Sequence, residues 1–301
     1  MERHSQRLFR IVFVGLLIST SAVFADPTVL ATVNGRPISV NDVQGDLFLN
    51  QLPEHATPEQ RRATIERLID RELIRGFLTR RKVVAHEDDV ERQVQAIKRL
   101  LEAKNEGYEE TLAKVGLTEE SLRDYLALPI AWSQHVGTVL TESRIAEEWK
   151  QSGSHFDGTK VTASHIVRIV PKDAPDSDWQ DAESLLERVR ADVVAGRLTF
   201  AEAAQENSQS PSGKLGGSLG EFEYFGRIAE SISRIAFHLP SGEISEPVRT
   251  PFGVHLIRVE KRTPGDLSLE DVRPQLIEQI TKELWDDQVA RERKSARIEV
   301  H

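Results

Sequence analysis

Residues 161–167 read VTASHIV and residues 252–260 read FGVHLIRVE, and these two stretches decide the fold. Apolar side chains occupy alternate positions in both, which is typical of a strand that buries one face. His165 shares the phase of Val161, Ala163, Val167 and Ile169, and His255 shares the phase of Ile257 and Val259. We therefore predict two strands that each bury a histidine.

The sequence between these strands predicts two helices and a loop. Residues 179–195 carry apolar side chains at helical spacing and end at Gly196. Thr199 followed by Glu202 has the spacing of a capping box, which opens a second, short helix. The glycine-rich stretch GKLGGSLG at 213–220 is expected to be a loop. Residues 159–262 thus predict a small domain with strand–helix–helix–strand order.

The flanking sequence is mostly helical. Residues 29–33 predict one strand before the Asn34-Gly35 turn, and helices are expected at 57–80, at 87–103 and from 118 past Trp132. Residues 151–154 read QSGS and are a candidate linker.

One further helix is expected within residues 266–301. Its apolar stripe needs a partner, because a single amphipathic helix is marginal alone. We expect the N-terminal helices to supply it, so that the small domain is an insertion. The stripe comprises Val272, Leu276, Ile280 and Leu284.

The first 25 residues have the pattern of a secretory signal peptide. Three arginines within residues 1–10 precede an apolar run at 11–18, and Ala25 ends a plausible cleavage site. The run is short for a membrane span. We therefore favour a cleaved signal over an uncleaved anchor, and expect membrane attachment only if this segment stays.

Composition excludes several classes of function. The chain has no cysteine, which excludes disulfides, thiolate metal sites and a cysteine nucleophile. Its net charge of −9 and the absence of a basic tract offer no electrostatic case for nucleic-acid binding. The 213–220 stretch lacks the Lys-Ser/Thr ending of a phosphate loop, and no nucleophile elbow of a serine hydrolase is present. We expect no nucleotide and no cofactor.

His165 and His255 can meet if their strands pair. Two neutral imidazoles can share a hydrogen bond by adopting complementary tautomers. Either a structural core pair or a catalytic pair fits this pattern, and the residues alone leave both interpretations open. A metal site is disfavoured, since no third ligand accompanies the pair at motif spacing.

Residues 161–260 resemble a parvulin-type peptidyl-prolyl cis-trans isomerase (rotamase) domain. The flanking stretches ATVNGRPIS (31–39) and ERLIDRELI (66–74), with the C-terminal helix, resemble SurA-like chaperones and PrsA-type foldases. The matching motifs of the central domain are, in chain order, VTASHIV (161–167), LTFAEAAQENS (198–208), GGSLGEF (216–222), IAFHLPSGEISEPVRT (235–250) and FGVHLIRVE (252–260).

This resemblance implies an α+β fold, in which a small antiparallel sheet with surrounding helices is inserted in an all-helical chaperone-like domain. The implied parts are a signal peptide (1–25), a SurA-N-like helical domain (26–158), the isomerase domain (159–262) and a C-terminal helix that packs on the N-terminal domain (263–301).

The resemblance also implies a site. The family's two central histidines fall on His165 and His255, and its polar position opposite them, usually Asp or Cys, falls on Ser210. A hydroxyl forms hydrogen bonds but carries no charge at neutral pH. The implied substrate-binding residues are Leu219, Ile228 and Ile232 for the proline ring, Phe222 in the pocket wall, and Phe252.

Several of these positions depart from the family pattern. Ile228 and Ile232 replace the usual Met and Phe, Phe252 replaces a Ser or Thr, and one extra residue stands between Phe222 and Gly226. The resemblance implies an exported, periplasmic isomerase and chaperone that acts on X–Pro bonds of unfolded or newly translocated polypeptides. The alternative is a weakly active or inactive parvulin fold that binds extended chains.

Overall fold

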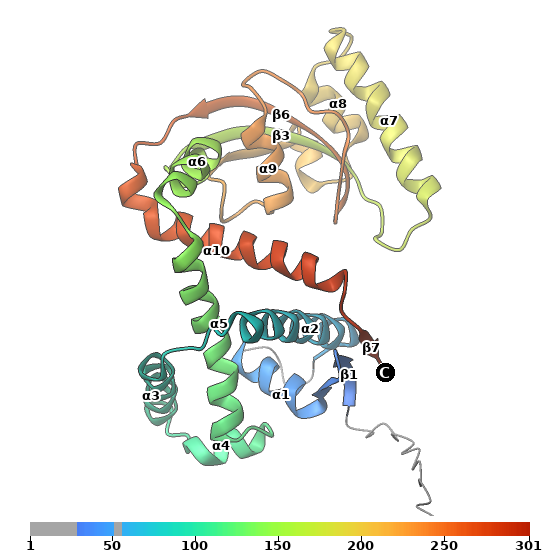
Figure 1. Ribbon diagram of the computed structural model, residues 1–301. Helices are drawn as coiled ribbons and strands as arrows, with labels where there is room; N and C mark the ends of the chain where they lie inside the picture. The colour runs from blue at the N-terminus through green and yellow to red at the C-terminus, as the bar shows by residue number, and fades with distance from the viewer. Residues whose placement is uncertain (1–28, 51–55) are drawn as a thin grey trace, which may run out of the picture. The chain divides into compact units, whose positions relative to one another are not determined.

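The computed structural model describes residues 29–50 and 56–301, so the expected signal peptide lies outside the described residues. The described residues divide into two compact units (Figure 1): residues 29–50 and 56–131 together with 289–301, and residues 132–288. None of the described helices is both long and apolar enough to span a lipid bilayer.

The first unit combines a small sheet with helices. Strands β1 (Val29–Val33), β2 (Arg36–Ser39) and β7 (Ile298–Val300) form an antiparallel sheet in the order β2-β1-β7. Asn34 and Gly35 join β1 to β2 with φ values of 52° and 82°, because a two-residue hairpin of this type needs positive φ at both positions. The sequence analysis predicted only β1 in this unit, and the structure adds β2 and β7.

The helices of the first unit largely follow the predicted pattern. The capping box at Thr57 and Gln60 is present, as is the helix predicted at 87–103. The helices are α1 (Val40–Leu49), α2 (Pro58–Arg81), α3 (Glu87–Ala103), α4 (Tyr108–Lys114) and α5 (Glu119–Val139), which continues into the second unit.

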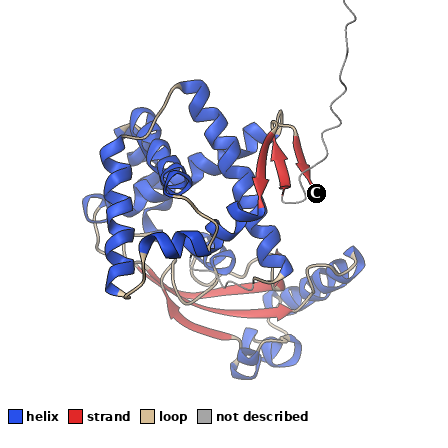
Figure 2. Ribbon diagram, turned by 90° about the horizontal axis from the view of Figure 1, so that it is seen from below, coloured by secondary structure: helices blue, strands red, loops and turns tan. Residues whose placement is uncertain are grey.

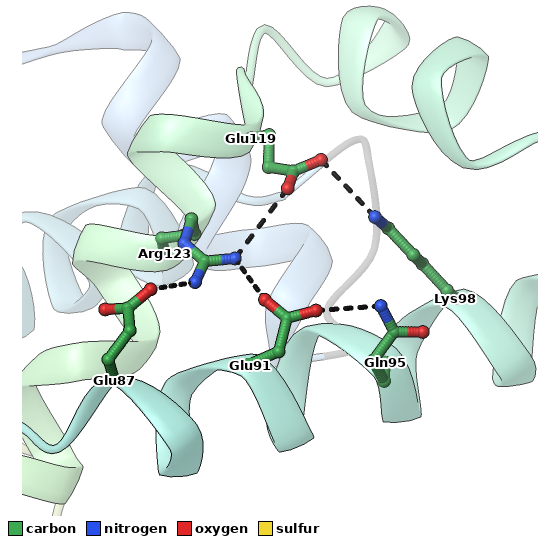
Figure 3. A network of polar contacts seen from close by, with 6 residues as sticks. All are labelled: Glu87, Glu91, Gln95, Lys98, Glu119 and Arg123. Carbon is green, nitrogen blue, oxygen red and sulfur yellow. Dashed lines mark hydrogen bonds and ion pairs between the residues drawn. The ribbon is translucent and has the colours of Figure 1, made fainter.

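A polar network joins α3 to α5 (Figure 3). Arg123 of α5 donates to Glu91 at 2.6 Å and also to Glu87, while Lys98 of α3 lies 3.5 Å from Glu119. Exposed ion pairs contribute little singly, up to about 1 kcal/mol, so this network fixes the orientation of the two helices more than it stabilises them.

The second unit contains a four-stranded antiparallel sheet, shown in red in Figure 2. Its order is β4-β3-β6-β5, with β3 and β6 at the centre. The strands are β3 (Lys160–Arg168), β4 (Ser218–Phe222), β5 (Val248–Thr250) and β6 (Gly253–Thr263), and the helices are α6 (Glu142–Ser152), α7 (Asp176–Val194), α8 (Phe200–Asn207), α9 (Glu230–His238) and α10 (Leu269–Arg293). This is the expected α+β fold.

Two details of this unit correct the sequence-based expectation. Residues 151–154 are not a linker: α6 runs to Ser152 and a 3₁₀ turn follows at Gly153–His155. The stretch 213–220 is only partly a loop, because it contains the end of a 3₁₀ turn (Pro211–Leu215) and the start of β4. Glycine content favoured a loop there, but did not indicate that the chain pairs with β3.

Each face of the sheet has its own core. On one face Ile166, Val254 and Leu256 pack with α7 and α8. On the other face, the cluster of Val161, Ala163, Ile257 and Val259 packs with Phe222 and with α9. Alternation along β3 and along residues 254–259 of β6 divides their side chains between these two cores.

The stripe of the C-terminal helix is buried within the second unit. Leu276 and Ile280 of α10 are fully buried and pack against Ile145 of α6. From residue 289 onward the helix belongs to the first unit, where Arg293 pairs with Asp70. The expected domain boundaries, at 158 and 262, remain a prediction.

Gly217 tests how tightly β4 must approach β3. Its φ is +81°, its carbonyl accepts the N–H of His165 at 2.9 Å, and an added Cβ would lie 2.3 Å from the carbonyl oxygen of His165. We expect Gly217→Ala to lower the free energy of unfolding by more than about 2 kcal/mol, since it adds a clash to the cost of left-handed backbone. Urea unfolding measures this.

Gly196→Ala is the matched control. Gly196 also has positive φ, +70°, but an added Cβ meets nothing within 4 Å. We expect this variant to lose only about 1 kcal/mol. Equal losses for the two variants would contradict the close approach.

Candidate functional site

The central strands bring the two predicted histidines together. In the antiparallel register His165 of β3 faces Ile257, and His255 of β6 faces Val167, so the histidines are diagonal neighbours on one face. Their ring centroids lie 5.6 Å apart with an interplanar angle of 31°. Alternation along each strand placed both rings on this face, and the register set their separation.

A serine that the sequence analysis missed contacts this pair. Nε2 of His165 lies 3.0 Å from Oγ of Ser212, and Oγ of Ser212 lies 3.0 Å from Oγ of Ser210. The predicted Ser210 therefore reaches His165 only through Ser212. Ser210 also caps the 3₁₀ turn by accepting the Ser212 N–H. The Ser-Pro-Ser order at 210–212 was the available signal, since such turns bring hydroxyls two residues apart together.

His255 has a buried imidazole with no hydrogen-bond partner within the described part of the chain. Its side chain is 3% exposed, and neither ring nitrogen has a hydrogen-bond partner among the described residues. Nδ1 of His165 is likewise unpaired within the described chain. The two imidazoles therefore touch but do not share the hydrogen bond that complementary tautomers would allow. Three buried ring nitrogens therefore have no hydrogen-bond partner among the described residues.

Both histidines are held in the neutral form. Burial lowers the pKa of His255 to about 4, with a further contribution from the charge of His165. Burial also lowers the pKa of His165. Desolvation disfavours the charged imidazolium, so at neutral pH each ring offers one donor and one acceptor. Such a site suits an uncharged polar group such as an amide.

Four of the five predicted substrate-binding residues gather on the histidine face. Phe222 and Ile232 belong to the buried cluster on that face, and the half-buried Leu219 and Ile228 pack against it. Two cavities of about 670 and 600 Å³ in the described chain are lined by other residues. The apolar surface on the histidine face is formed by side chains of β4 and α9.

Phe252 is placed differently. It lies in the turn between β5 and β6, its side chain is 55% exposed, and its N–H donates to Oγ1 of Thr250 at 3.1 Å. No contact described in the structure joins it to the apolar cluster. The resemblance implied a substrate-binding role for Phe252, and in this structure the turn leaves its ring exposed to solvent.

Arg227 is a second residue that sequence reasoning missed. Its Nη2 donates to the carbonyl oxygens of Leu219, at 2.7 Å, and Glu221, at 3.2 Å. It thereby holds the segment that carries Ile228 against β4. No run or spacing distinguishes this arginine from other exposed ones in the sequence.

Within the described residues, no group of histidine, aspartate and glutamate side chains is arranged to hold a metal ion. The site contains a pair of neutral imidazoles, two hydrogen-bonded serine hydroxyls and an apolar surface. These groups can accept or donate hydrogen bonds and exclude water from a small substrate group.

Comparison with known proteins identifies both parts of the chain. Residues 165–261 match the family model of the PPIC-type peptidyl-prolyl isomerase (rotamase) domain, and residues 1–136 match that of the SurA-like N-terminal domain.

Three relatives illustrate the similarity. The foldase protein PrsA of Clostridium botulinum is 24% identical over 81% of this chain and 74% of its own length. A putative peptidyl-prolyl cis-trans isomerase SurA of Haemophilus influenzae is 24% identical over 99% and 98%. The chaperone SurA of Cupriavidus pinatubonensis is 32% identical over 53% of this chain but only 32% of its own length.

The low pKa of His255 predicts a pH dependence of stability. The unfolded chain binds a proton near pH 6.5, whereas the folded chain resists protonation until about pH 4. The free energy of unfolding is therefore at its full value above pH 6.5. It falls as the pH drops toward 4, by up to about 3 kcal/mol. We expect His255→Leu, which buries no titrating group, to lose less stability than the wild type over this range in urea unfolding. Parallel pH profiles for the two proteins would contradict the burial of a neutral His255.

Proposed function

Because this chain joins a SurA-like N-terminal domain to a PPIC-type peptidyl-prolyl isomerase domain and is homologous to PrsA and SurA proteins, we propose that it is an exported folding helper that isomerises X–Pro bonds in unfolded or newly translocated polypeptides. The contact of the His165 and His255 rings beside an apolar cluster is the observation that carries this proposal.

The reaction fits these groups because it breaks no bond. Rotation about an X–Pro amide must overcome a barrier of about 18–20 kcal/mol that arises from amide resonance. A catalyst needs only to hold the proline ring in an apolar place and to favour the twisted amide over both planar forms. Neutral hydrogen-bonding groups and apolar side chains are sufficient, so neither a nucleophile nor a metal is required.

Each residue then has a role. Leu219, Ile228 and Ile232 hold the proline ring, and Phe222 packs behind them. His165, His255 and Ser210, linked through Ser212, form the polar side of the site beside the rotating carbonyl. For Phe252, whose ring is exposed, we propose a contact with residues that flank the proline.

The proposed location rests on the first 25 residues. Their basic start, apolar run and small residue before position 26 indicate export, and an exported isomerase with chaperone-like flanks would meet polypeptides as they emerge from translocation. We propose the periplasm as its compartment and extended polypeptides containing X–Pro bonds as its substrates.

The isomerase proposal predicts measurable catalysis. In a protease-coupled assay on proline peptides, we expect the protein without residues 1–25 to accelerate isomerisation above background, and His255→Leu to reduce kcat/KM by about 10-fold or more. Absence of any wild-type acceleration would remove the enzymatic proposal.

Variants of the two serines test which hydroxyl acts directly on His165 and which acts through the other. Ser212→Ala removes the hydroxyl that touches His165, so we expect kcat/KM to fall about 5-fold, as for the loss of about 1 kcal/mol of hydrogen bonding. Ser210→Ala should reduce it less, since Ser210 acts through Ser212. The reverse order would show that Ser210 is the substrate-facing hydroxyl.

A second function, binding of extended chains without isomerisation, is favoured by a cavity in the first unit. This cavity has a volume of about 670 Å³, lies within the SurA-like part and is lined by Val43, Leu47, Phe48, Ile65 and Val115 among others, with Arg61, Glu110 and Lys114 also in its wall. Apolar walls with a few charged groups suit an extended polypeptide segment.

The binding function is tested with a client that contains no proline. We expect the wild type and His255→Leu to suppress its aggregation equally, because isomerisation is not needed, and Phe48→Glu to suppress it less. Thermal unfolding of each variant controls for loss of the fold. Unchanged suppression by a folded Phe48→Glu protein would exclude this cavity as the binding place.

A further inference from the structure

A histidine outside the matched isomerase domain stacks on a loop of that domain. His155 ends the 3₁₀ turn after α6, ten residues before the matched segment begins. Its ring lies 3.7 Å from the ring of Tyr224, centroid to centroid, at an interplanar angle of 14°. This is a parallel stack with nearly complete overlap, in contrast to the tilted contact of the His165 and His255 rings.

The loop that His155 contacts carries a proposed substrate-binding residue. Tyr224 and Phe225 stand between Phe222 and Ile228, in the stretch where this chain has one residue more than the family pattern. Tyr224 is 6% exposed, and its ring also meets that of Phe237 in α9 edge-on at 5.3 Å. Tyr224 is therefore held between α9 and His155.

A second aromatic contact lies beside the first. The rings of Phe156 and Phe225 are 5.3 Å apart, and those of Tyr224 and Phe225 are 4.8 Å apart. Aromatic pairs at such separations each contribute beyond their buried area. Two consecutive residues before β3 thus contact two consecutive residues of the loop.

The backbone that presents His155 is fixed. The N–H groups of Phe156 and Asp157 donate to the carbonyl of Gly153, and the carbonyl of Asp157 accepts the N–H of Leu267 at 3.1 Å. Beside this, Oγ1 of Thr159 accepts the N–H of Gly265. The entry to β3 and the exit from β6 are therefore joined, and His155 has a rigid support.

At neutral pH the stacked ring is uncharged. Burial, followed by the nearby charge of His238, lowers the pKa of His155 to about 4. The contact with Tyr224 is therefore a stack of two neutral rings, which a phenyl ring at position 155 can reproduce.

We propose that His155 is a positioning residue of the isomerase site: its stack on Tyr224 orders loop 223–228 and so places Ile228 against the substrate proline. The inference rests on the proposed function for its effect on catalysis. Its structural half, the ordering of the loop, does not depend on any activity.

The experiment compares His155→Ala, His155→Phe and wild type by proline-peptide kinetics and by hydrogen–deuterium exchange. We expect His155→Ala to raise KM about 3-fold to 10-fold with kcat changed less than about 2-fold, because the loop binds the ring but the histidine pair is untouched. Amides of 223–228 should exchange faster, with those of β3 and β6 unchanged. His155→Phe should restore both properties.

Leu185→Ala controls for general destabilisation. Leu185 of α7 packs on the opposite face of the sheet, so its truncation lowers stability without touching the loop. An unchanged KM and unchanged exchange of 223–228 in His155→Ala, or a rise of KM in Leu185→Ala equal to that in His155→Ala, would overturn the proposal. If the wild type catalyses no isomerisation, the proposed function fails, while exchange at 223–228 still decides whether His155 orders the loop.

Discussion

The antiparallel pairing of β3 with β6 is the interaction on which the rest of the second unit depends. It runs from Lys160 opposite Thr263 to Arg168 opposite Val254, with one irregularity after Thr162. A shift of one strand by one residue would move every side chain of that strand to the other face of the sheet. If β6 shifted, His255 would leave the face that carries His165 and the apolar cluster, and Leu256 would lie where Ile257 now packs. The two cores, built from alternate residues of the same strands, fix this register.

The site buries imidazole nitrogens that have no hydrogen-bond partner among the described residues. Buried polar groups are normally hydrogen-bonded, and an unpaired buried nitrogen carries a desolvation cost of about 1–3 kcal/mol. His255 has two such nitrogens among the described residues, and a core pair kept only for packing would be better served by apolar side chains. The residues alone favour a structural pair over a catalytic pair and leave both interpretations open. The unpaired nitrogens, next to the hydroxyl relay through Ser212, favour the catalytic interpretation.

The features that could be predicted from the sequence are those set by neighbouring residues, such as strand alternation, helix caps and turns. Alternation placed His165 and His255 on buried faces, the Thr57 and Thr199 capping boxes located two helix starts, and Asn-Gly located a turn. Ser212 and Arg227 could not be found in this way, because their roles depend on backbone carbonyls and hydroxyls that only the folded chain brings near. Residues 151–154 had the composition of a linker, yet Gly153 fits against the indole of Trp149, so close packing decided the outcome.

The junction where Asp157 meets Leu267 and Thr159 meets Gly265 has a consequence for how such a chain can change over time. Because the chain enters β3 and leaves β6 beside the same hydrogen bonds, the two ends of the segment from β3 to β6 lie close together. Segments whose two ends lie close together tolerate insertion and exchange between proteins better than segments whose ends are far apart. A junction built from backbone groups and one threonine hydroxyl makes few demands on side-chain identity, and so would survive the exchange.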